Sequence, residues 1–211
     1  MTFRFIFSLL LFTSLTFAQF AALNLKPKGE SLYNINTDVT TWPQGGEIID
    51  KARGIKLVAE FVEYQEGVYI KAKNAQAEGF FGVLNTPELN LDATTNIITS
   101  TGGISLNQGG LNLSADTLRL YLDQSIVVLS GNVSNQAPSF QTAHLVIKIG
   151  AGYALLVSPF TYQDGALNLS KSSVGSLIQL NQTKEADESF TYSISTTLDE
   201  TVNNELSPYV P

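Results

Sequence analysis

Apolar residues recur at every second position along much of this chain. The segment Gly110-Leu111-Asn112-Leu113-Ser114 has this alternation, and Gly165-Ala166-Leu167-Asn168-Leu169-Ser170 repeats it. Segments 118–123 and 145–149 follow the same pattern. Because successive side chains of a β-strand point to opposite faces, each segment predicts a strand with one apolar face and one polar face.

Turn-forming residues separate these segments at short intervals. Glycine, asparagine and aspartate lie between predicted strands at 55–62, 68–72, 88–92, 97–101, 104–107, 111–115, 117–122 and 126–129. Many short strands with turn signals between them are typical of an all-β sandwich, barrel or solenoid. Laying the segments over one another also reveals a degenerate internal repeat whose spacing is not constant.

The alternation changes phase in the middle of segment 111–122. Leu111 and Leu113 follow one phase, whereas Leu118 and Leu120 follow the other. Keeping all four on one face requires an extra residue near Asp116, which a β-bulge or a sharp bend would supply. A sheet that bends at the same point in each repeat folds over on itself.

The beginning of the chain has the layout of an exported protein. Residues 1–18 contain a single positive charge, Arg4, then the apolar run 5–17 and an acceptable cleavage site at Thr16-Phe17-Ala18. We interpret 1–18 as a cleaved signal peptide. The alternative is that 5–23 remains as a membrane anchor, since it approaches the roughly 20 residues that span a bilayer.

The remaining chain divides into three parts. Residues 19–47 contain Pro27, Pro43 and several glycines, so they predict a loop with one strand near 31–35. Residues 48–181 form the β domain. Residues 182–211 have six acidic residues and one lysine, and they predict a largely flexible acidic tail in which 190–194 adds a last strand.

Composition excludes several classes of function. The 211 residues include no cysteine, and the net charge is −7. An acidic chain without a basic cluster cannot neutralise nucleic-acid phosphates, and charge alone would not hold it on an anionic membrane. We therefore expect no nucleic-acid partner and no disulfide framework.

The residues that could support catalysis or metal binding are few and scattered. His144 is the single histidine, so a structural role is the better interpretation. Glu60, Glu63 and Glu66 are close in sequence, but on a strand Glu63 would face away from the other two. Aspartates 92, 116, 123 and 164 occur singly at turns. The sequence predicts no enzyme activity, no cofactor and no metal; an extracytoplasmic hydrolase is a remote alternative.

One part of the chain resembles a known family. Leu111-Asn112-Leu113-Ser114-Ala115-Asp116-Thr117-Leu118-Arg119-Leu120, followed by Val128-Leu129-Ser130-Gly131-Asn132-Val133, is similar to the OstA-like family of lipopolysaccharide-transport bridge proteins in Gram-negative periplasms. Ala115-Asp116, Leu118, Tyr121 and Gly131-Asn132-Val133 fit the family pattern. Thr142-Ala143-His144-Leu145 forms a weaker second copy, and the match covers roughly 65–170.

The resemblance implies a half-open, twisted β jelly-roll of stacked short antiparallel strands that holds the acyl chains of a lipid or glycolipid. Its edge strands would pair with other β jelly-roll envelope proteins, and an ABC transporter complex would supply energy. It implies a periplasmic, non-enzymatic carrier or bridge between membranes, with Lys71, Lys73, Arg119 and Lys148 as candidates for lipid phosphates. The residues expected to contact lipid are Leu89, Leu91, Ile104, Leu106, Leu111, Leu113, Leu118, Leu120, Leu122, Leu129 and Val133.

A second interpretation stays open. The same apolar face could form a completely packed core, as in a structural β-solenoid or an adhesin-type module of the cell envelope. Leu167 and Leu169 have the same inward phase and the same two interpretations. A cavity in the fold would favour the carrier, whereas a filled interior would favour the structural module.

Overall fold

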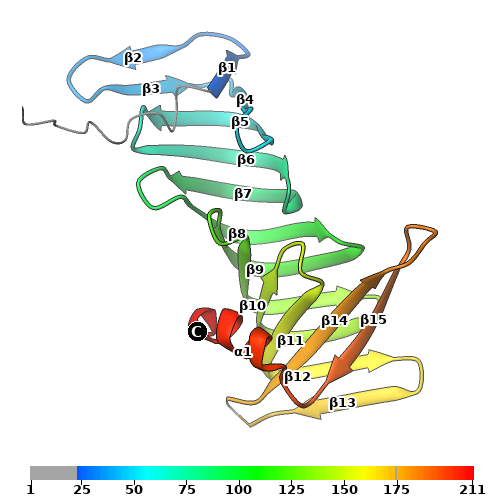
Figure 1. Cartoon of the computed structure of the whole chain (residues 1–211). Coiled ribbons are helices and arrows are strands. Elements are labelled where there is room, and N and C mark those ends of the chain that lie inside the picture. Colours follow the sequence, from blue (N-terminus) through cyan, green and yellow to red (C-terminus); the bar gives the residue numbers. More distant parts are fainter. Residues whose placement is uncertain (1–22, 174) are drawn as a thin grey trace, which may run out of the picture.

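The computed structural model describes residues 23–173 and 175–211 and confirms an all-β protein. Its main feature is one open antiparallel sheet of 15 strands whose order largely follows the sequence (Figure 1). Neighbouring long strands are connected by short turns, and most of these turns contain or adjoin glycine, asparagine or aspartate. The signal peptide predicted at 1–18 lies outside the described residues, as does nearly all of the alternative anchor at 5–23.

The strands differ in length, with the longest in the middle of the sheet. They are β1 (Leu23–Pro27), β2 (Leu32–Asn34), β3 (Val39–Trp42), β4 (Gly46–Asp50), β5 (Ile55–Gln65), β6 (Tyr69–Gly79), β7 (Gly82–Asp92), β8 (Ile97–Gln108), β9 (Leu111–Tyr121), β10 (Ile126–Gln136), β11 (Ser139–Lys148), β12 (Tyr153–Asp164), β13 (Leu167–Lys171), β14 (Leu177–Lys184) and β15 (Phe190–Ser195).

Each long strand bends near its middle. In β9, Ala115 and Leu118 are both buried, while Asp116 and Thr117 between them are exposed, which confirms the phase change predicted at this point. The pairing of β9 shifts register there against both β8 and β10. Gly102 and Gly103 of β8 have φ values of 90° and 88°, a region that favours glycine. The bends of neighbouring strands line up, so the sheet folds over as predicted.

The bends divide the sheet into two halves that face each other across the interior. We call half I the strand segments that end at turns 93–96 and 122–125, and half II those that end at turns 80–81 and 109–110. Most of the buried apolar residues form one cluster supplied by both halves, including Leu120 of half I and Leu113 of half II. The line along which the turns of the two halves approach each other is the rim of the fold.

The sheet forks at both ends. Strand β5 pairs with β3 through residues 62–65 and with β4 through residues 55–59. At the other end, β12 pairs with β14 through 153–157 and with β13 through 160–164. Strands β14 and β15 then run diagonally across the rim rather than along either half (Figure 1).

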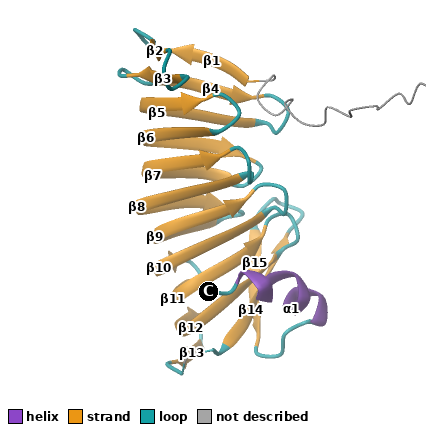
Figure 2. Ribbon diagram, turned by 90° about the vertical axis from the view of Figure 1, so that its left-hand side faces the viewer, coloured by secondary structure: helices purple, strands orange, loops and turns teal. Residues whose placement is uncertain are grey.

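A short helix covers part of the outer surface. Helix α1 (Glu200–Leu206) is followed by the 3₁₀ turn η1 (Ser207–Tyr209), and it lies beside the last strands of the sheet (Figure 2). Val202 and Leu206 pack on Val128, Val146 and Leu155, which point outward. Among the residues that the structure describes, no helix is long and apolar enough to cross a membrane.

These elements differ from the predicted division of the chain. The sheet extends from 23 to 195 rather than from 48 to 181. Segment 19–47, expected to be a loop with one strand, contains β1, β2, β3 and the start of β4, because Pro27 and Pro43 fall at strand ends where they remove no needed donor. The expected flexible tail at 182–211 instead contains the end of β14, then β15 and α1. Helix α1 is held on the sheet because Val202 and Leu206 are buried.

Candidate functional site

The eleven residues named above as lipid contacts all point into the interior, whereas Leu167, which was given the same inward phase, is 45% exposed on the edge strand β13. Ten of the eleven belong to the main buried cluster, and Leu91 is half-buried and packs against it. The structure therefore brings together residues from β7, β8, β9 and β10, including Leu122 just after β9. Their shared inward direction follows from the alternation and from the aligned bends.

The centre of this interior is filled by the protein itself. Leu106, Leu113, Leu120, Leu129 and Val133 have no exposed surface. Side chains of the facing half occupy the space that an acyl chain would need. These positions are core in the described conformation, and lipid could reach them only if the two halves moved apart.

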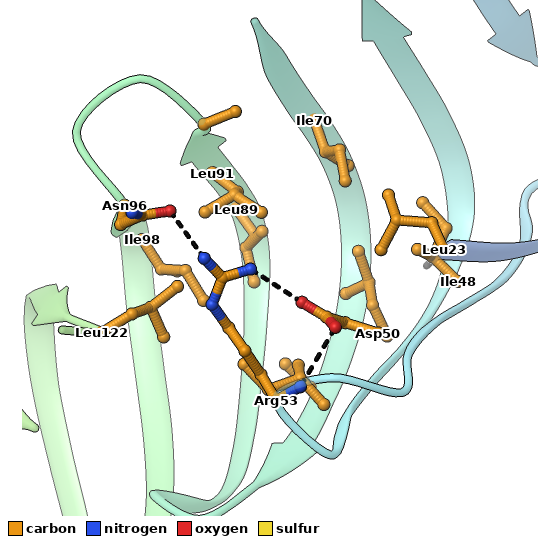
Figure 3. A pocket seen from close by; sticks show the side chains of 14 residues that line it. Leu23, Ile48, Asp50, Arg53, Ile70, Leu89, Leu91, Asn96, Ile98 and Leu122 are labelled. Atoms are coloured by element: carbon orange, nitrogen blue, oxygen red, sulfur yellow. Dashed lines mark hydrogen bonds and ion pairs between the residues drawn. The ribbon is translucent and has the colours of Figure 1, made fainter. Parts of the chain in front are cut away.

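An apolar crevice lies between the halves near the N-terminal end of the sheet. It encloses about 40 Å³, and the rim above it is polar (Figure 3). Half I supplies one wall and half II, with β1 and β4, supplies the other. The apolar lining residues are Leu23, Ile48, Ile55, Leu57, Ile70, Ala77, Leu89, Leu91, Ala93, Ile98 and Leu122.

A chain of polar contacts closes the rim over this crevice. Arg53 Nη1 donates to Asp50 Oδ2 at 2.9 Å, and Arg53 Nη2 donates to Asn96 Oδ1 at 3.0 Å (Figure 3). Asn96 Nδ2 in turn donates to Asp123 Oδ2 at 3.1 Å. Arg53 lies in the turn before β5, whose residues 56–59 pair with residues 75–78 of half II, and Asn96 lies in turn 93–96 of half I. The hydrogen bond between Arg53 and Asn96 therefore links the two rims. We call the contacts of Asp50, Arg53, Asn96 and Asp123 the rim bridge.

Local sequence explains how Arg53 is held. Asp50 Oδ1 accepts hydrogen bonds from the backbone N–H groups of Ala52 and Arg53 at 2.9 and 3.1 Å, a turn that Asp favours. Asn96 has a φ of 54°, a conformation that Asn tolerates better than most residues. Sequence analysis missed Asp50, Arg53 and Asn96, since only the fold shows that residues 43 positions apart meet.

The basic residues proposed for lipid phosphates lie on the outer face, away from the crevice. Lys71 Nζ is 3.4 Å from Glu63 Oε1, and Lys148 Nζ donates to the Gln124 carbonyl at 2.9 Å. Lys73 lies over the Phe61 ring. Arg119 alternates with the inward Leu118 and Leu120 and is exposed. In this conformation none of the four could neutralise a head group at the rim bridge.

The acidic residues and the histidine have ordinary structural contacts. Glu60 and Glu63 share the outer face, because β5 bends between the inward Ala59 and Val62; the expectation that Glu63 faces away from Glu60 is wrong. Glu60 accepts a hydrogen bond from Asn74 at 2.7 Å. His144 Nδ1 lies 2.9 Å from Ser130 Oγ, and burial lowers the pKa of His144 below its usual range.

Comparison with known proteins does not assign this chain to a family. A scan against protein-family models gave no match, and a search of curated proteins also gave none. The resemblance to the OstA-like family therefore stays a prediction from the residues quoted above.

Proposed function

We propose that this protein is a non-enzymatic carrier or bridge for an acyl-chain lipid of the cell envelope, built on a half-open β jelly-roll of the OstA-like type. The observation that carries the proposal is the apolar crevice between the two halves, which is continuous with the inward leucines and closed by polar side chains. In the described residues it is lined by apolar side chains from both walls, as an acyl chain requires.

The crevice is too small for a lipid as it stands. Sites for small molecules usually enclose roughly 300–1,000 Å³, against about 40 Å³ here. Binding therefore requires the rims to separate, which breaks the hydrogen bond between Arg53 and Asn96. Half I and half II would move apart about the line of bends, where Gly102 and Gly103 interrupt the regular pairing.

The proposed partners follow from the ends of the sheet. Strands β1 and β15 terminate the order of the sheet, so each has one edge without a neighbouring strand in the part of the chain that is described. Such edges accept a strand from another protein. A periplasmic location, an ABC transporter complex as energy source and lipopolysaccharide-like cargo remain parts of this proposal.

A photo-crosslinking experiment tests the proposal. A benzophenone amino acid replaces Leu91 in the crevice, Leu113 in the filled centre or the exposed Gln76 on the outer face. With envelope lipids present, we expect Leu91 to crosslink lipid well above Gln76, and R53Q to increase that yield. If Leu91 and Gln76 give the same yield with and without R53Q, the carrier proposal is wrong.

One observation favours the structural alternative. The centre of the interior is filled, with several leucines completely buried, as expected for a rigid β-solenoid or adhesin-type module. In that case no inward position would capture lipid, and R53Q would change only stability.

A further inference from the structure

A groove on the outer surface of the fold is much larger than the apolar crevice. It lies over strands β5 to β8, where the outer face of half I reaches the line of bends (Figure 1). The groove holds about 370 Å³. Sites for small molecules usually hold roughly 300–1,000 Å³, so this groove has the size of a binding site without any movement of the two halves.

Strand register arranges the outward side chains of this groove in two parallel rows. Residues within a row are directly paired from one strand to the next, and the two rows are two residues apart along each strand. Because neighbouring strands are roughly 4.8 Å apart, a row over four strands extends for about 14 Å. One row consists of Glu63, Lys71, Asn90 and Thr99, and the other consists of Phe61, Lys73, Glu88 and Thr101.

The same outer face has a different character farther along the sheet. The first row continues through Arg119 into Val128, Val146 and Leu155. Helix α1 packs on these three apolar side chains. The outer face is therefore apolar where the protein covers it, and polar over β5 to β8, where no described helix lies on it. The polar groups of the groove are thus available to a ligand.

The charged side chains of the groove balance one another. Lys71 Nζ lies 3.4 Å from Glu63 Oε1, and Lys73 lies opposite Glu88 on the neighbouring strand. An anionic ligand would meet two carboxylates here, on a chain whose net charge is −7, and a cationic ligand would meet two ammonium groups. The groove therefore fits an uncharged ligand whose groups both donate and accept hydrogen bonds.

The side chain of Asn90 lacks a hydrogen bond that a buried amide normally has. Its Oδ1 is shielded from solvent and accepts no hydrogen bond, and it is the one such side-chain atom among the residues that the structure describes. Leaving a buried acceptor unpaired costs free energy. Asn90 lies within the first row and lines the groove, so a hydroxyl group of a ligand could pair with this amide once it rotates.

Phe61 gives the groove an apolar corner. The ring is partly buried, and Lys73 Nζ lies 5.8 Å from its centroid. A sugar ring has C–H groups on its faces and hydroxyl groups around its edge. Its C–H groups can leave water by packing on an aromatic side chain, while its hydroxyl groups reach the neighbouring amide, carboxylates and lysines.

We propose that the groove over β5 to β8 binds sugar rings of an uncharged glycan, with C–H groups packed on Phe61 and hydroxyl groups bonded to Asn90, Glu63 and Glu88. A free polysaccharide and the sugar part of a glycolipid share this chemistry. The groove is on the outer face and the crevice opens to the interior, so this binding goes beyond the proposed carrier function and does not depend on it.

An array of neutral bacterial oligosaccharides and polysaccharides provides the first test, with the full chain as the probe. The neutral oligosaccharide that binds best is then titrated into isotope-labelled protein and followed by NMR. We expect the amide shifts to concentrate at 71–73, 88–90 and 99–101, with none at 109–113. High salt should leave the affinity unchanged, because the ligand has no charge.

Matched amide variants test the role of Asn90. N90A should weaken binding about tenfold, since it removes the central hydrogen-bonding group. Q76A removes an exposed amide from the outer face of half II and should leave the affinity unchanged. The thermal midpoint of N90A should equal or exceed that of the wild type, because the variant loses a buried unpaired oxygen.

Matched aromatic variants test the role of the Phe61 ring. F61L keeps an apolar side chain but removes the planar ring, so it should weaken binding, whereas F80L at a 42% exposed position should not. Titration of the same oligosaccharide linked to a lipid identifies the source of the glycan. N90A should weaken both forms, and a higher affinity of the lipid-linked form would assign the groove to a glycolipid.

Three results would overturn the proposal. The wild-type chain could bind no neutral glycan on the array, or it could bind acidic glycans alone. Equal affinities of N90A, F61L and the wild type would place any binding outside the groove. Lipid crosslinking at Leu91 in N90A should match that of the wild type, so the carrier proposal succeeds or fails separately.

Discussion

The two ends of the sheet close the interior in different ways. Near the C-terminal end, β14 and β15 cross the rim, and Tyr192 Oη and Gln182 Nε2 both donate to the Gly109 carbonyl of half II. Tyr192 and Ile194 also pack against the core. Near the N-terminal end, the rims are linked by the hydrogen bond between Arg53 and Asn96 over an apolar crevice.

The difference indicates where the fold can open. At the C-terminal end, separation of the halves would expose apolar side chains and break the hydrogen bonds that side chains of the paired strands β14 and β15 make to half II. At the N-terminal end, separation would likewise expose buried apolar side chains such as Leu57, Ile70 and Leu89, but the polar link between the rims is made by one partly exposed arginine. Under the proposed carrier function, we therefore expect the rims to separate first at the N-terminal crevice, where a single arginine links them.

The largest expected effect distinguishes the filled centre from the crevice. L113A removes a completely buried side chain and should lower the free energy of unfolding by about 2–5 kcal/mol, since it leaves a cavity. L91A, at a half-buried position beside the crevice, should cost about 1 kcal/mol. Urea unfolding followed by circular dichroism measures both. Equal losses would show that the crevice is packed as tightly as the centre.

The next effect concerns the outer cover of the C-terminal end. L206A shortens a buried side chain that packs on the outward residues of β10, β11 and β12. We expect a loss of about 2 kcal/mol, at the low end for buried leucine because the short helix can adjust. Unfolding in urea provides the measurement, with the exposed E200A as control. An unchanged midpoint would mean that α1 adds no stability.

A smaller effect tests the closure at β15. Y192F removes the hydrogen bond to the Gly109 carbonyl but keeps the ring against the core, so it should cost about 1 kcal/mol. Hydrogen exchange of the amides around 109–110 should rise in this variant, while exchange around 93–96 stays unchanged. Equal increases at both turns would contradict an independent closure of the two ends.

The smallest expected effect is a pH dependence of the folding stability that comes from His144, which lies at the line of bends. Burial lowers the pKa of His144 in the folded protein, so the unfolded chain binds this proton more readily. The stabilising contribution is complete above the unfolded pKa of roughly 6.5 and is lost as pH falls toward the lower folded pKa. H144Q should flatten the decrease of the thermal midpoint between neutral and mildly acidic pH. A parallel decrease in both proteins would show that His144 does not contribute.

The sequence predicted which segments are strands better than it predicted where one strand ends and the next begins. Segments 97–101 and 104–107 were predicted as two strands, but they are the two halves of β8, because Gly102 and Gly103 interrupt the alternation and not the strand. The strand predicted at 190–194 is confirmed as β15. Helix α1 was missed, because only Val202 and Leu206 carry its apolar spacing over seven residues.

The inward face could be predicted residue by residue, whereas the crevice could not. Alternation together with the bend expected near Asp116 places Leu113 and Leu120 on one face, and both are buried. The rim bridge depends on how far one half of the sheet approaches the other, and no local pattern contains that distance. Arg53 and Asn96 meet because the line of bends brings turns from different halves together.

The forks of the sheet limit how this molecule can be extended. At each end the last long strand has two different neighbours, β3 and β4 on β5, and β13 and β14 on β12. At each end, a neighbouring protein that continues the sheet therefore meets two separate strand edges, one on each wall of the fold. A single added strand would lengthen only one wall of the fold, and a continuous apolar passage between molecules would require the partner to supply a strand to each wall.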